Sequence, residues 1–168
     1  LALSGRLSEP VRKRVLDDVL MASRELSRYE AACVAARVAG KVDESAREPL
    51  LDEVMATLAV QGTAFPAGDP ASEDGGRAQL IIDVAPLLSG GRLDRAVDLA
   101  RQLDTAWARS RALAALAPHA TRLVRSSLLA DALAAASEVV PAGSRVRVLA
   151  DAASLAAPAW LAPGARSQ

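Results

Sequence analysis

The chain has 168 residues, a length typical of one domain, and its 20 basic and 20 acidic side chains balance to a formal charge of zero. This balance argues against a protein built mainly to hold nucleic acid or an anionic membrane surface. Aromatic residues make up 2% of the chain and hydrophobic residues 51%, so we expect a core of alanine and branched aliphatic side chains, which suits closely packed helices.

Three further classes of protein are excluded by the sequence. Cys33 is the only cysteine, so no disulfide can form within the chain. No run of 18 apolar residues is present, so we expect no transmembrane helix. The opening stretch, Leu1–Arg14, carries its charges after a short apolar start, which is the reverse of a signal peptide. We therefore expect a cytoplasmic protein, and the start at leucine suggests a segment of a longer chain.

One apolar pattern recurs four times and predicts the first helix of a helix pair. After each anchoring leucine, apolar side chains return at the third, fourth, seventh and tenth following positions, with Ser23 and Gln61 as the exceptions. This spacing places them on one face of a helix. The anchors are Leu16, Leu51, Leu93 and Leu129, which are 35, 42 and 36 residues apart.

A second helix is predicted after each of these. Its apolar columns are Ala35-Val38-Ala39, Ile81-Val84-Ala85, Leu113-Leu116-Ala117 and Leu149-Ala152-Ala153. Gly40, Pro86 and Pro118 follow the first three columns, and Ser154 follows the fourth. Glycine is expected to end its helix in a left-handed cap, and proline cannot continue a helix.

Two local signals modify the second repeat. Gly62–Gly76 is rich in Gly, Pro, Asp and Ser and is predicted to be a loop, which explains the longer spacing of 42 residues. This loop is either a tolerated insertion or a recognition loop. The sequence SARE, Ser45–Glu48, predicts a capping box at the start of the next helix.

The repeat predicts an all-α fold, a right-handed α-solenoid of about four antiparallel helix pairs with a period of 35–36 residues. We expect a single domain over residues 1–168, with repeats at about 8–40, 45–88, 91–118 and 126–157 and an irregular end at 159–168. The period is close to that of tetratricopeptide repeats, but the Trp-Leu-Gly-Tyr pattern of those repeats is missing, so the fold is expected to be tetratricopeptide-like.

The stretch AVDLARQLDTAWARSRALAALAPHA, Ala96–Ala120, resembles a repeat of large bacterial proteins. Its features are an Ala-Leu helix, an Asp-containing turn, an aromatic residue and then Arg-x-x-Ala-Leu-x-x-Leu-Ala-Pro. Such repeats form sensor or scaffold arms of STAND-type, NACHT-like signalling NTPases. The resemblance implies a helical-repeat scaffold in a bacterial signalling protein, and the motif is complete only in the third repeat.

No catalytic or metal-binding pattern is present in the sequence. Cys33 and His119 are the only thiol and imidazole, and they lie two repeats apart, too far for a nucleophile–base pair. A phosphate-binding loop is missing, since Ser89–Arg95 offers arginine where the lysine is required. We therefore expect no enzyme activity, no cofactor and no metal.

The residues most suited to a partner are arginines and aromatics at the start of the second helices. They are Arg77, Arg109, Arg111, Arg145, Arg147, Trp107 and Tyr29. One interpretation is structural: the arginines pair with acids of a neighbouring helix, such as Asp94, Asp98 and Asp131, or cap its end, and the aromatics pack between repeats. The other is a groove of arginines that grips an acidic segment or phosphates.

These observations favour a non-catalytic protein–protein interaction module, a helical-repeat scaffold or sensor. The alternative is a helical-repeat module that binds nucleic acid through the arginines, against which zero net charge and the scarcity of aromatics weigh. Apolar faces at the ends of the repeat array would also allow self-association.

Overall fold

The computed structural model describes residues 14, 18–19, 21, 26–60, 70–139 and 142–156. Within these residues all regular structure is helical and no strand is present, which confirms the all-α prediction. The predicted first helix, anchored at Leu16, falls mainly outside the described residues, as does the end of the chain at 159–168. The helices are α2 (Arg28–Ala39), α3 (Glu44–Leu58), α4 (Pro70–Val84), α5 (Gly90–Arg101), α6 (Ala106–Leu116), α7 (Arg122–Ser137) and α8 (Ala142–Ala156). In this part of the chain no helix has the length and apolar character that crossing a membrane requires.

The chain forms two compact units, residues 1–63 and 64–168, which are described separately. The boundary falls inside the second predicted repeat, between α3 and α4. In the N-terminal unit, α2 and α3 pack against each other, and their shared core includes Ala35, Val54 and Leu58, each at most 1% exposed. The continuous stack of four repeats in one domain therefore stays a prediction.

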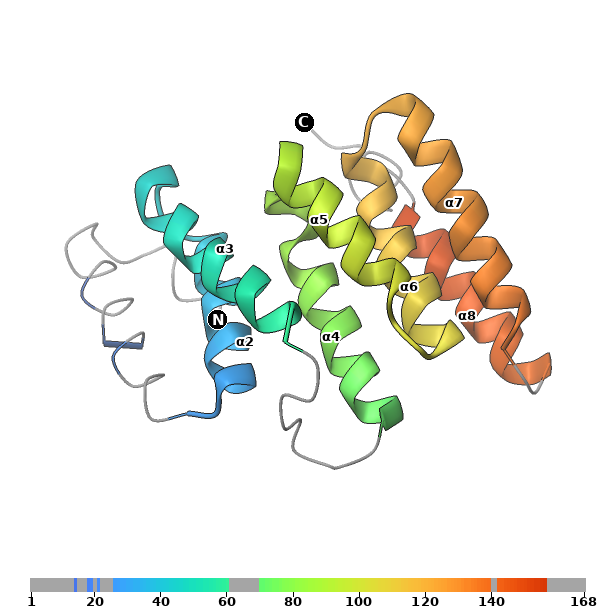
Figure 1. Ribbon diagram of the computed structural model, residues 1–168, viewed down its shortest axis with the longest axis horizontal. Coiled ribbons are helices and arrows are strands. Elements are labelled where there is room, and N and C mark those ends of the chain that lie inside the picture. The colour runs from blue at the N-terminus through green and yellow to red at the C-terminus, as the bar shows by residue number, and fades with distance from the viewer. Residues whose placement is uncertain are drawn as a thin grey trace, which may run out of the picture. The chain divides into compact units, whose positions relative to one another are not determined.

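In the C-terminal unit, α6 is the central helix. It packs against α4, α5, α7 and α8, and Figure 1 shows it with α4 and α5 on one side and α7 and α8 on the other. Ala112, Ala114 and Leu116 of α6 are fully buried although they point in different directions around the helix. Because four helices surround α6, its sequence is apolar on nearly every side, and the alanines allow the neighbouring helices to approach closely.

The predicted helix ends are confirmed in position, and one differs in conformation. The α-helices α4 and α6 each end two residues before their proline, Pro86 or Pro118, and each proline lies in a short 3₁₀ turn, Ala85–Leu87 or Ala117–His119. Gly40 is the C-cap of α2, with φ −74° and ψ −4°. The expected left-handed cap at Gly40 is therefore wrong, because the backbone there stays in the right-handed region that any residue adopts.

The predicted capping box at Ser45–Glu48 is wrong. The N-cap of α3 is Asp43, whose carboxylate accepts a hydrogen bond from the Ala46 amide at 3.0 Å. A capping box of the same S-x-x-E pattern lies instead at the start of α2. There the Glu30 carboxylate accepts from the Ser27 amide at 3.0 Å and from the Ser27 hydroxyl at 2.7 Å, and these bonds lower the pKa of Glu30.

The predicted loop at 62–76 is wrong over its second half, because α4 begins at Pro70. Proline suits the first turn of a helix, since its missing amide hydrogen would have no partner there. Two tertiary contacts hold the residues that follow. The carboxylate of Asp74, 4% exposed, accepts from the Thr105 amide at 2.6 Å, and a Cβ added at Gly75 would lie 3.2 Å from Cζ3 of Trp107. Residues 61–69 lie outside the described residues.

Helices α4, α6 and α8 share one register, obtained by aligning Arg77, Arg109 and Arg145. In that register the last core position is filled by Val84, Leu116 and Ala152, each at most 4% exposed. A second core position is filled by Leu80, Ala112 and Val148, each at most 1% exposed. The second helices of repeats two to four therefore turn the same face toward the core.

Candidate interaction surface

Four helices carry an arginine as their fourth residue, and each reaches back to the end of the preceding helix. These turn arginines are Arg47 of α3, Arg109 of α6, Arg125 of α7 and Arg145 of α8. The last carbonyl groups of a helix have no partner within the helix, and they carry its negative dipole end. A guanidinium therefore satisfies them and adds a favourable charge.

Arg47 and Arg125 make the same contact in the two compact units. Nε of Arg47 donates to the carbonyl of Ala39, eight residues earlier, at 3.0 Å, and Nη2 donates to that of Val42 at 3.1 Å. Nε of Arg125 donates to the carbonyl of Ala117, also eight residues earlier, at 3.1 Å, and Nη2 donates to that of Pro118 at 2.9 Å. Each fork closes the connection between two successive helix pairs.

Arg109 and Arg145 close the turn within a pair. Nη1 of Arg109 donates to the Leu103 carbonyl at 2.7 Å, and Nε of Arg145 donates to the Val139 carbonyl at 3.1 Å. Each acceptor lies six residues before its arginine. Arg109 also forms an ion pair with Glu138, at 2.6 Å between Nη2 and Oε2. Arg109 thus uses both of its Nη groups, and Arg145 uses its Nε group, to hold these turns.

Arg111 differs from the turn arginines because its guanidinium stacks on an aromatic ring and, among the described residues, donates to no carbonyl group. Its guanidinium carbon lies 4.9 Å from the ring centroid of Trp107, one turn earlier on α6. Within the described part of the chain, Arg111 forms no hydrogen bond or ion pair, and its Nε is buried without a hydrogen-bond partner. Trp107 remains 36% exposed. The stack leaves the hydrogen-bonding capacity of the guanidinium unused.

The remaining predicted residues lie in different surroundings. Arg77 is 6% exposed on α4. Arg147 is exposed on α8, at the position that corresponds to Arg111 on the adjacent α6. Tyr29 is half-buried on α2 in the N-terminal unit. Trp107, Arg111 and Arg147 are the predicted residues that reach the surface of the C-terminal unit with an aromatic face or an unengaged guanidinium; we call them the Trp–Arg surface.

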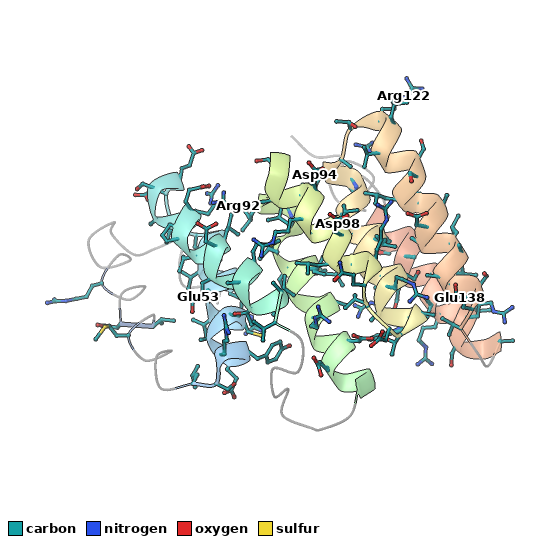
Figure 2. The ribbon with its side chains drawn as sticks, in the orientation of Figure 1. Glu53, Arg92, Asp94, Asp98, Arg122 and Glu138 are labelled. Carbon is teal, nitrogen blue, oxygen red and sulfur yellow. The ribbon has the colours of Figure 1, made fainter. Side chains whose placement is uncertain are left out.

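The acids chosen as partners of the arginines mostly lie elsewhere. Asp94 and Asp98 are exposed on α5 (Figure 2) and, among the described residues, pair with none of the predicted arginines. Asp131 of α7 pairs with Arg101 of α5 at 2.7 Å. The predicted Arg109 pairs instead with Glu138, at the end of α7 opposite to Arg122 (Figure 2). Glu138 was not predicted as a partner, because an apolar periodicity does not show which acid of one helix pair meets an arginine of another.

The turn arginines Arg47 and Arg125 were also overlooked, although the sequence contains a signal for them. In DESAR, TAWAR and TRLVR an Asp or Thr stands four residues before the arginine. Asp43, Thr105 and Thr121 are the N-cap residues of α3, α6 and α7. A cap residue followed at the fourth position by arginine therefore marks the turns of this repeat.

No group of three or more His, Cys, Asp or Glu side chains in the described part of the chain is placed to hold a metal ion. Cys33 lies half-buried on α2, in the N-terminal unit, and His119 lies in the C-terminal unit. Partial burial, helped by the charge of Arg125, lowers the pKa of His119 and favours the neutral imidazole.

Comparison of the chain with protein-family models, with curated proteins and with solved structures found no match in any of the three.

Proposed function

We propose that the chain is a non-catalytic protein–protein interaction module, a helical-repeat scaffold or sensor whose Trp–Arg surface binds an acidic segment of a partner protein. The observation that carries the proposal is the Arg111 guanidinium, stacked on the partly exposed Trp107 with none of its hydrogen bonds made within the described residues. An arginine already held by a ring loses little further freedom when it binds a carboxylate.

The architecture we propose is a right-handed, tetratricopeptide-like α-solenoid. Two observations support it: α4, α6 and α8 turn equivalent residues to the core, and α6 packs against both the preceding α4 and the following α8. In such a stack the same position of successive helices forms a row across the surface. Arg111 of α6 and Arg147 of α8 hold equivalent positions on adjacent helices and are therefore neighbours in such a row.

The chemistry of the Trp–Arg surface suits an acidic peptide. Packed helices lie about 8–10 Å apart, and acids three residues apart in a polyproline II peptide lie on one side at about 9 Å. Two such carboxylates match the spacing of Arg111 and Arg147, and the exposed part of the Trp107 ring, beside Arg111, can contact an apolar residue of the peptide. Tryptophan and arginine are the residues most enriched at the energetic centres of protein interfaces.

The resemblance of Ala96–Ala120 to the arms of STAND-type signalling proteins supports a wider role. We propose a place for this module in the sensor or scaffold arm of a larger bacterial, cytoplasmic signalling protein. The acidic segment would then belong to a ligand of the sensor or to another part of the same assembly.

The test uses the fluorescence of Trp107. The chain has two tryptophans, so Trp160→Phe leaves Trp107 as the single reporter. This variant is titrated at low salt with a peptide that carries glutamate at every third position, and with the matching glutamine peptide. We expect the emission to change with the acidic peptide alone, and Arg111→Gln and Arg147→Gln to weaken binding by roughly tenfold each, about 1.4 kcal/mol.

The matched control is Arg122→Gln, which removes the same charge from an exposed arginine at the start of α7 (Figure 2). Binding should be unchanged in this variant. Equal weakening by Arg122→Gln and Arg111→Gln would mean that only the overall charge attracts the peptide, and the proposed surface would be rejected. A single-stranded oligonucleotide that binds more tightly than the peptide, with a steep loss at higher salt, would instead favour the nucleic-acid alternative.

A further inference from the structure

The last helix pair exposes apolar side chains at positions that are buried in the earlier pairs. In the shared register of α4, α6 and α8, the position of Val146 is filled by Ala78 and Ser110. Ala78 and Ser110 are 0% exposed, whereas Val146 is 69% exposed. The position of Leu149 is filled by Ile81 and Leu113, which are at most 1% exposed, whereas Leu149 is 36% exposed.

The same difference appears on the first helix of the pair. Leu133 of α7 corresponds to Val97 of α5, 36 residues earlier. Val97 is 5% exposed and Leu133 is 55% exposed. The core-facing residues Val148 and Ala152 of α8 are buried as in the earlier helices, so α8 is packed in the correct register. The exposed apolar side chains therefore lie on a different face of the helix pair from the core-facing residues, and their equivalents on this face are buried in the earlier repeats.

The earlier pairs show what covers these positions: a further layer of helices. Helix α6 packs on α4, and both α7 and α8 pack on α6. We call the exposed surface formed by Leu133, Val146 and Leu149 the end face. On α8 the exposed residues one turn away from Val146 and Leu149 are small and uncharged, namely Ala142, Gly143, Ala150 and Ala153, and the exposed Arg147 lies at the edge of this face. This composition allows another helix to approach closely and imposes no charge on it.

We propose that the end face binds the end face of a second copy of this chain, so that the α7–α8 pairs of the two copies pack together about a twofold axis. In such a contact each residue meets its own counterpart or a near neighbour. A charged surface would repel itself in this arrangement, whereas an uncharged apolar one is complementary to itself. The end face meets that requirement over its apolar part, and helices of this repeat are the structures that pack on α4 and α6, where the positions of Val146 and Leu149 are buried.

The size of the end face predicts the strength of the contact. With 16 and 15 residues, α7 and α8 are about 24 and 22 Å long, and each helix is about 10 Å wide. The pair thus offers about 500 Å² per copy, or about 1,000 Å² in total, which is at the lower limit for specific interfaces. We therefore expect a reversible dimer with a dissociation constant in the micromolar range.

The test is sedimentation equilibrium of the full chain over a wide range of micromolar concentrations. We expect the mass to rise with concentration from that of the 17.4 kDa chain toward twice that value. Val146→Glu places a charge in the contact of each copy and should raise the dissociation constant at least about tenfold. Because Val146 is exposed, the variant should keep its helical circular dichroism and its melting temperature.

Met21→Glu is the matched control, since Met21 is 59% exposed and belongs to the N-terminal unit. Its dimerisation should equal that of the original chain. A monomer at all concentrations, or a dimer unaffected by Val146→Glu, would overturn the proposal. A chain that dimerises only after the double change Trp160→Ala and Leu161→Ala would also overturn it, because its own C-terminal segment would then be the occupant. Leu133→Glu places the charge on α7 and leaves α8 and Arg147 unchanged, so it should weaken the dimer and still bind the acidic peptide, and the two proposals can fail separately.

Discussion

Replacement of Arg109 by alanine tests the role of the turn arginines most directly. Arg109 donates to the carbonyl of Leu103 at 2.7 Å and to that of Asp104 at 3.3 Å, and it pairs with Glu138 at 2.6 Å. It thereby joins the start of α6 to the ends of both α5 and α7. Leu103 is 1% exposed, so its carbonyl group is poorly placed to find water when the guanidinium is removed.

The cost of Arg109→Ala follows from these contacts. A hydrogen bond from a charged donor to the Leu103 carbonyl contributes about 1.5–3 kcal/mol. The ion pair contributes less, at most about 1 kcal/mol, because the Glu138 side chain is 59% exposed and screened by water. We therefore expect the free energy of unfolding to fall by roughly 2–4 kcal/mol. Each kcal/mol corresponds to a decrease of about 2–4 °C in melting temperature for a chain of this length.

The measurement is urea unfolding followed by circular dichroism, with Glu138→Gln as the matched variant. Glu138→Gln removes the ion pair and leaves both carbonyl contacts, so it should cost less than about 1 kcal/mol. Arg109→Lys keeps the charge but loses the planar guanidinium, so its loss of unfolding free energy should lie between those of Glu138→Gln and Arg109→Ala. If Glu138→Gln destabilises the chain as much as Arg109→Ala, the carbonyl contacts contribute nothing and the argument about the turns is wrong.

Two further substitutions have expected signs that follow from local structure. Ser110→Ala should stabilise the chain by about 1 kcal/mol, since the Ser110 hydroxyl is buried without a hydrogen-bond partner in the described part of the chain and Ala78 fills the equivalent position; a loss of stability in urea unfolding would show that the hydroxyl is satisfied. Gly90→Ala should destabilise by about 1–2 kcal/mol, because Gly90 has φ +53°. Gly91→Ala, at the neighbouring residue, should instead stabilise the chain by about 0.5–1 kcal/mol, because Gly91 has no positive φ and open space at the Cβ position. Equal thermal shifts in the two glycine variants would contradict this reasoning.

The candidate surface was only partly predictable from the residue pattern. In the sequence, Arg109, Arg111 and Arg145 belong to one predicted group, since arginines recur in register at the start of the second helices. The structure separates them: Arg109 and Arg145 donate to backbone carbonyls, while Arg111 lies over Trp107. Periodicity shows where a side chain leaves its own helix, but the groups that it meets belong to other helices, and their positions depend on the turns between them.

The sequence by itself determined the helical class and the places where most helices occur, because an apolar residue every third or fourth position can bury one face only as a helix. It also located the ends near Gly40, Pro86 and Pro118, since these residues end helices through their own backbone chemistry. Only the tertiary structure decided that Pro70–Gly76 is helical. The contact of Gly75 with Trp107 and the bond from the Thr105 amide to Asp74 come from α6 and the turn before it, about 30 residues away. The local sequence, with Pro70, Gly75 and Gly76, does not predict these contacts. Packing against another helix supplies the stabilisation that this sequence lacks by itself.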